Sequence, residues 1–126
     1  MPDCNVCISS DSYDMAEEWH VSEISEALTE FTCCECQRSF PKGSHQQVGF
    51  LKYDGSETIN FETCADCVEI HRALSCDGPR IVHCLWEQVS EEIFPEMTRA
   101  CIAKVKTPRA RRYLQERWMK WKGLTA

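Results

Sequence analysis

The sequence lacks the features of a membrane, fibrous or repeat protein. No apolar run in its 126 residues approaches the length of a membrane-spanning helix, which is about 20 residues. No low-complexity tract and no solenoid repeat is present. The first ten residues, MPDCNVCISS, contain no basic segment, no apolar core and no small-residue cleavage site of a secretion signal. These absences favour a small cytoplasmic protein.

Motifs of the common enzyme classes are also missing. The sequence contains no phosphate-binding glycine loop, no nucleophile elbow and no paired-carboxylate site. His45, Asn60 and His71 raise the alternative of a His-Asn-His (HNH-like) nuclease, because Asn60 lies four residues before Cys64. However, Ser44 stands where an acidic residue should precede the first histidine, so a general base has no support. We therefore expect a protein that is not an enzyme.

Cysteine, by contrast, is abundant. Ten cysteines in 126 residues is a frequency found in disulfide-rich secreted proteins or in intracellular metal-thiolate proteins. Because the N-terminus does not resemble a secretion signal, we expect reduced cysteines that bind metal.

Two Cys-x2-Cys pairs have the spacing of one zinc site. Cys33 and Cys36 precede a polar run and a Pro-Lys-Gly turn, and 27 residues separate Cys36 from the second pair, Cys64 and Cys67. The intervening QQVGFLKY and ETINFET flank Asp54-Gly55, which favours a two-stranded hairpin. After this pair, apolar residues recur at helical spacing up to Ser75: Val68, Ile70, Ala73 and Leu74. This order of parts predicts an α+β fold, in which a small zinc-stabilised, treble-clef-like domain is followed by C-terminal helices.

A second zinc ion has weaker support. Cys4-x2-Cys7 is a third well-spaced pair, and it could join Cys76 and Cys84, with His83 as a substitute ligand for Cys84. The cofactor expectation is therefore one Zn²⁺, with a second as an open alternative. Cys34 and Cys101 are expected to pack as small apolar side chains. Closed four-thiolate coordination is typical of structural rather than catalytic zinc.

The secondary structure of the other segments is predicted with different clarity. Residues 13–31 fit a helix and a broken strand equally well. Leu85, Trp86, Val89 and Ile93 lie on one helical face, and Pro95 begins a predicted short helix through Ile102. Thr107-Pro108 predicts the start of a last helix, which extends to Gly123.

The net charge of −6 hides two opposite parts. Residues 1–103 carry 6 Lys/Arg against 19 Asp/Glu, a net charge of −13, whereas residues 104–126 carry 8 against 1, a net charge of +7. We therefore divide the chain into a zinc domain with a helical extension, residues 1–103, and a basic aromatic helix, residues 104–126. The candidate binding residues of this helix are Arg109, Arg111, Arg112, Tyr113, Arg117, Trp118, Lys120, Trp121 and Lys122.

Three interpretations of the basic helix remain open. Its cations and aromatic rings suit nucleic acid, and its amphipathic pattern suits the groove of a partner protein. Alternatively, Trp118 packs on the body while the cations face Glu87, Glu91 and Glu92.

Several motifs together resemble a known group of proteins. Cys33-Cys34-Glu35-Cys36, Pro41-Lys42-Gly43, Phe61-Glu62-Thr63-Cys64 and the passage from Cys76 to Glu87 resemble small cysteine-rich proteins of tailed bacteriophages and prophages, whose function is unassigned. The segment from Thr107 to Gly123 is similar to their C-termini. One departure is acidic: Glu23, Glu26 and Glu30 precede the first cysteine pair, where a basic run is expected.

The resemblance implies a phage origin, metal binding and a bacterial host cytoplasm, but no activity. From it and the charge pattern we expect an accessory protein that binds a host or phage macromolecule. The first candidate partner is a protein complex of a defence or nucleic-acid-processing system, which the protein would inhibit. Direct DNA or RNA binding through residues 104–126 is the alternative.

Overall fold

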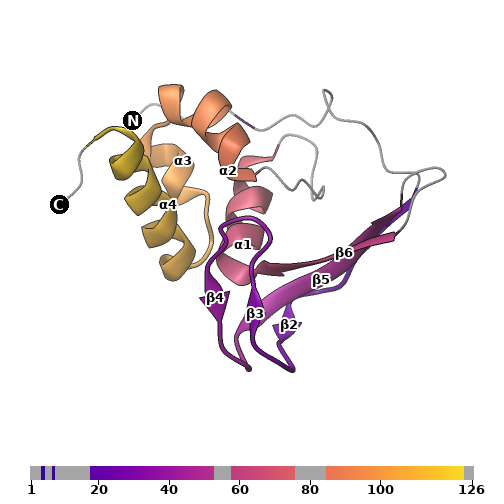
Figure 1. Cartoon of the computed structure of the whole chain (residues 1–126). Helices are drawn as coiled ribbons and strands as arrows, with labels where there is room; N and C mark the ends of the chain where they lie inside the picture. Colours follow the sequence, from indigo (N-terminus) through magenta and orange to yellow (C-terminus); the bar gives the residue numbers. More distant parts are fainter. Residues whose placement is uncertain (1–3, 5–6, 8–17, 53–57, 76–84, 124–126) are drawn as a thin grey trace. The chain divides into compact units, whose positions relative to one another are not determined.

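The chain forms two compact units. The computed structural model describes Cys4, Cys7 and residues 18–52, 58–75 and 85–123. One unit, here called the strand-rich unit, is Asp11–Val68; the other, the helical unit, combines Met1–Ser10 with Glu69–Ala126. The expected boundary after residue 103 falls inside the helical unit. The mixed α+β class with small antiparallel sheets and C-terminal helices is confirmed (Figure 1).

The strand-rich unit is built around β5, His45–Lys52. β6, Thr58–Cys64, pairs with it antiparallel, from Gln46 opposite Cys64 to Lys52 opposite Thr58. This confirms the predicted hairpin strands, while the Asp54-Gly55 turn lies outside the described residues. Along its other edge, β5 pairs with β1, Glu18–Val21, and then with β2, Ser25–Glu26.

The segment 13–31, which the sequence left open, is not helical where it is described: it forms β1 and β2, with a bend at Leu28 and Thr29 before β3. Its two short strands occupy successive stretches of one edge of β5. Ser22 joins them, because its amide donates to the Val48 carbonyl and its hydroxyl accepts from the Val48 amide. Gly49 of β5 lies opposite Val21 of β1. A Cβ atom at Gly49 would collide with the His20 carbonyl oxygen and the Phe61 ring. The pairing thus requires glycine at this position.

A second, two-stranded sheet carries the first cysteine pair. It consists of β3, Phe31–Thr32, and β4, Ser39–Phe40, whose two phenyl rings stack at 5.3 Å. The turn between them closes through hydrogen bonds from the Cys33 amide to the Arg38 carbonyl and from the Gln37 amide to the Cys33 carbonyl. Gln37 adopts a left-handed conformation with φ of 63°. α1, Ala65–Leu74, begins directly after β6.

The helical unit contains the predicted apolar face. α2, Leu85–Gln88, continues into a π-helical turn, η1, Val89–Ile93, and a 3₁₀ turn, η2, Phe94–Glu96. Leu85, Trp86, Val89 and Ile93 are all buried, as their spacing predicts. The helix expected from Pro95 to Ile102 is wrong as one element: Met97 and Thr98 are extended, and α3 is limited to Arg99–Ala103.

The last helix is confirmed. α4 is Pro108–Trp121, preceded by Thr107 in an extended conformation. Ala110 and Leu114 are fully buried and fix one face of α4 in the core of the helical unit. Across the described residues, no helix combines the length and the apolar character needed to cross a membrane.

Candidate metal centre and basic helix

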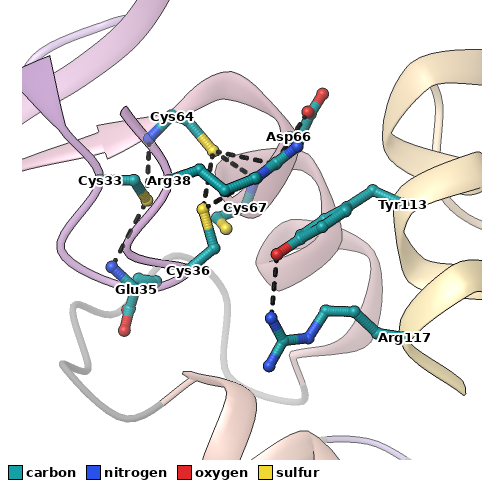
Figure 2. Close-up of polar contacts among 9 residues, drawn as sticks. All are labelled: Cys33, Glu35, Cys36, Arg38, Cys64, Asp66, Cys67, Tyr113 and Arg117. Carbon is teal, nitrogen blue, oxygen red and sulfur yellow. Dashed lines mark hydrogen bonds and ion pairs between the residues drawn. The ribbon is translucent and has the colours of Figure 1, made fainter. Parts of the chain in front are cut away.

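Four cysteines of the strand-rich unit converge on one point (Figure 2). Cys33 and Cys36 come from the turn between β3 and β4, Cys64 ends β6, and Cys67 lies in the first turn of α1. Their four sulfur atoms all lie within 4.8 Å of one another. The predicted ligand set of the first site is therefore brought together from three separate elements.

The spacing of these sulfurs fits a tetrahedral metal. Zinc–sulfur bonds of about 2.3 Å in a tetrahedron place the sulfurs about 3.8 Å apart. The Sγ atoms of Cys36 and Cys64 lie 3.9 Å apart, and three of the four cysteines are buried. Such a cluster is consistent with one metal ion, and a tetrahedral set of four thiolates matches zinc.

Backbone amides are directed at the sulfurs. The amides of Glu35 and Cys64 donate to the Cys33 sulfur at 3.4 and 3.3 Å, and the Cys67 amide donates to the Cys64 sulfur at 3.5 Å. The Glu35 and Cys67 contacts form because each Cys-x2-Cys turn folds its chain around the first sulfur, whereas the Cys64 amide reaches Cys33 from the end of β6. They stabilise thiolate charge that would otherwise be costly inside the protein.

Arg38 is a member of the site that the sequence analysis missed. Its Nε donates to the Cys36 sulfur at 3.2 Å, and its Nη2 lies 3.8 Å from the Cys64 sulfur (Figure 2). The same nitrogen forms an ion pair with the Asp66 carboxylate at 3.1 Å. Arg38 thus places one positive charge against two ligands. An arginine two residues after Cys36 and an aspartate two after Cys64 are the only signals in the sequence.

The thiols titrate differently around the cluster. The pKa of Cys36 is lowered, first by hydrogen bonds from Cys33 and then from Cys64 and Cys67, and Arg38 adds to this effect. The pKa of Cys67 is raised, because Cys33, Cys36 and Cys64 favour its protonated form and burial penalises its charge. Without metal, the four sulfurs therefore share protons, which a bound cation would displace.

Cys34 lies beside the cluster but outside it. Its half-buried thiol is 3.3 Å from the Thr63 hydroxyl oxygen, and burial raises its pKa to about 12. The expectation that Cys34 is not a ligand agrees with this position.

The second predicted cluster differs from expectation in its described members. Cys4 and Cys101 are joined by a disulfide, and Cys7 is also disulfide-bonded. Cys101 is therefore a covalent partner rather than only a packed apolar side chain, and Cys4 and Cys7 are oxidised in this structure rather than reduced. The helical face that buries Cys101 holds it against Cys4, which the sequence spacing did not indicate. Cys76, His83 and Cys84 lie outside the described residues.

The residues considered for a nuclease do not gather in the sheet. Asn60 pairs with Phe50, whereas His45 begins β5 five residues earlier. At about 3.3 Å per residue, they lie about 16 Å apart along the ribbon. His71, in α1, is half-buried, and burial, reinforced by Arg72, lowers its pKa to about 4.

The predicted binding residues of α4 occupy different environments. Arg109, Arg112, Lys120, Trp121 and Lys122 are exposed, whereas Arg111, Tyr113, Arg117 and Trp118 are half-buried. Arg111 donates to the carbonyls of Val105 and Lys106. Trp118 carries the Lys122 ammonium 3.9 Å above its ring.

Arg117 is held within the helical unit by two aromatic rings. Its guanidinium lies 4.1 Å from the centroid of the Trp86 ring. It also donates to the Tyr113 hydroxyl at 2.9 Å, a hydrogen bond drawn in Figure 2. The two rings meet edge to face at 5.4 Å. The sequence predicted that Trp86 lies on a buried helical face, but it did not predict that the Trp86 ring supports Arg117.

The acidic residues proposed to neutralise α4 do not do so. Among the residues that the structure describes, Glu87, Glu91 and Glu92 form no ion pair with any cation. Arg112 and Lys120 are likewise without an acidic partner in that part of the chain. Arg112 and Lys120, both exposed, therefore remain available on the surface of the helical unit.

No protein-family model, curated protein or solved structure matches the chain.

Proposed function

We propose that the protein is a non-enzymatic, zinc-stabilised accessory protein that acts by binding another macromolecule through α4. In this proposal, the β3–β4 turn, the β5–β6 hairpin and α1 form a treble-clef-like domain around one zinc ion. The zinc holds the fold, because four thiolate ligands leave no coordination position for a substrate.

One observation carries the binding role. α4 presents cations that have no acidic partner among the described residues, next to exposed apolar side chains. Met119 is 37% and Trp121 46% exposed. Large apolar groups beside unpaired cations are typical of interaction surfaces rather than of solvated helix faces.

A protein partner is the first candidate. Tryptophan and arginine are the side chains that most often dominate protein interfaces, and methionine is enriched there. The resemblance to cysteine-rich phage proteins makes a host defence or nucleic-acid-processing complex the proposed target. A basic helix would compete there for acidic surfaces that normally contact basic partners.

Direct nucleic-acid binding is the second candidate. It is favoured by the combination of cations and aromatic rings around Arg117. Nuclease activity is not proposed, since His45 and Asn60 stand at different levels of the ribbon. A metal-dependent nicking assay should accordingly give no product.

The proposal is tested by capture followed by reconstitution. Metal analysis of the full chain, purified under reducing conditions without chelator, should give about one zinc per chain. The chain is then immobilised in host lysate with and without nuclease treatment, and each captured partner is purified and its affinity measured. The double variant Arg112→Glu, Lys120→Glu should weaken this affinity at least tenfold.

Lys42→Glu is the matched control, because Lys42 is an exposed cation of the strand-rich unit. It should leave the affinity unchanged. Equal binding by the α4 variant and the native protein would remove α4 as the binding surface. Metal content well below one zinc per chain would remove the proposed scaffold.

A further inference from the structure

A groove of about 460 Å³ lies beside α4 within the helical unit. One wall is formed by Ser90 and Phe94 of η1 and η2, and the other by five residues of α4: Tyr113, Glu116, Arg117, Lys120 and Trp121. Arg117, Lys120 and Trp121 are among the predicted binding residues, while Ser90, Phe94 and Glu116 were not. We propose that this groove binds single-stranded nucleic acid, with one base stacked on Trp121 and its phosphate held by Arg117 and Lys120. This inference rests on the second candidate of the proposed function, direct nucleic-acid binding by α4, and names the site and the class of strand.

The base site is an exposed indole with a fixed position. Trp121 packs against Phe94 with ring centroids 5.6 Å apart and a tilt of 50°. Nearly half of its surface nevertheless remains exposed to solvent. A ring that is held on one side and open on the other provides a stacking face for an unpaired base at little entropic cost.

The phosphate site is a preoriented guanidinium. Stacking on Trp86 and the hydrogen bond to the Tyr113 hydroxyl fix the plane of Arg117. The guanidinium has five N–H donors, so most of them remain for a ligand anion, and it keeps its charge at any physiological pH. Lys120, exposed one turn further along α4, supplies a second cation.

The spacing of the two sites suits one nucleotide. Arg117 and Trp121 are four residues apart on α4, so they lie about one helical turn, roughly 5–6 Å, from each other on the same face. This is comparable to the separation between a phosphate and the base of the same nucleotide. Successive nucleotides would then follow the exposed cations of the net +7 segment 104–126.

A nucleic acid fits the groove better than an acidic peptide. Peptide anchors require a closed apolar socket, whereas this groove is open and its walls are as polar as they are apolar. A stacked base needs only one flat face. A single strand is favoured over a duplex, because the bases of a duplex already stack on each other.

The test is fluorescence anisotropy with the reduced, metal-containing full chain. The probes are a labelled 12-residue oligothymidylate, a duplex of the same length and a 12-residue oligoglutamate peptide. We expect the single strand to bind most tightly and to quench tryptophan emission. Trp121→Ala should weaken its binding by about 5- to 150-fold and abolish most of the quenching.

Leu28→Ala is the matched control, since Leu28 is an exposed apolar residue of the strand-rich unit and does not line the groove. It should leave affinity and quenching unchanged. Lys120→Ala should reduce the slope of log affinity against log salt by about 0.7, the contribution of one phosphate contact on a single strand.

Three results would overturn the inference: preference for the duplex, equal losses from Trp121→Ala and Leu28→Ala, or binding of the acidic peptide alone. Absence of binding to every probe would also overturn it. If the single strand fails while charge reversal of α4 still abolishes binding of a purified protein partner, the groove assignment is wrong and the proposed function stands.

Discussion

Replacing Arg38 by glutamine should weaken zinc binding by about 10- to 100-fold. Zinc with four thiolates carries a net charge of −2, and Arg38 is the cation in contact with that cluster. Glutamine keeps an amide of similar reach but removes the positive charge. The loss therefore reports the charge compensation rather than the presence of a donor.

The magnitude follows from the contacts. Hydrogen bonds to charged groups contribute about 1.5–3 kcal/mol each. The Nε contact to Cys36 at 3.2 Å is of this kind, whereas the 3.8 Å approach to Cys64 is weaker. The side chain of Arg38 is 34% exposed, so solvent screens part of the interaction. We therefore expect a total of about 1.5–2.7 kcal/mol, which corresponds to roughly 10- to 100-fold in affinity.

The assay is competition with a chromophoric zinc chelator, in deoxygenated buffer with a phosphine reductant that does not bind zinc. Asp66→Asn is the matched variant, because it removes the ion pair and leaves Arg38 against the sulfurs. It should cost less than the loss of Arg38. Cobalt absorption of both variants checks that the site remains tetrahedral. A change of less than about twofold for Arg38→Gln would refute the reasoning.

Three further results are expected. Zinc binding at pH 7 should release about two protons, because Cys64 and Cys67 have a raised pKa and must lose their protons to bind. Calorimetry in buffers of different ionisation enthalpy counts the released protons. Binding without proton release would contradict the conclusion that the metal-free sulfurs share protons. The free energy of unfolding should fall by at most about 3 kcal/mol as the pH falls from 6.5 towards 4. The reason is that the folded protein favours neutral His71, whereas the pKa of His71 in the unfolded chain is near 6.5. Urea titrations should show a weaker pH dependence for His71→Gln, and an unchanged pH dependence would contradict this role of His71. Cys101→Ser should destabilise the oxidised protein by up to about 5 kcal/mol, because the disulfide to Cys4 closes a loop of nearly 100 residues and so lowers the entropy of the unfolded chain. The reduced native and variant proteins should have the same melting temperature. Equal melting temperatures of the oxidised native and variant proteins would rule out the bond to Cys4.

The cluster could be predicted because ligand spacing is local. Each Cys-x2-Cys turn is coded within four residues, and the hairpin between them has its own alternating pattern. The closing partners are not local. Arg38 reaches Asp66 across 28 residues, and Cys101 meets Cys4 across 97, so neither contact leaves a periodic signal in the sequence.

The ambiguous segment before the cluster shows the same limit. Residues around Val21 and Ser25 have no decisive periodicity, and they become strands because the edge of β5 offers unpaired backbone groups. Conversely, Pro95 suggested a helix start, but the chain extends at Met97 and Thr98 before α3 begins. Tertiary pairing decided the first case and local backbone geometry the second.

Cys34 has a consequence for chemical labelling. The strand-rich unit holds five free cysteines, and the pKa of Cys34, about 12, leaves almost no thiolate on it at neutral pH. As the metal leaves, an alkylating reagent should therefore modify Cys33 and Cys36 first, because their pKa values are lowered. Cys34, Cys64 and Cys67 have raised pKa values and should react only afterwards. The mass of the intact labelled protein would then move in a step of two adducts, so that mass spectrometry can read metal occupancy molecule by molecule without an optical probe.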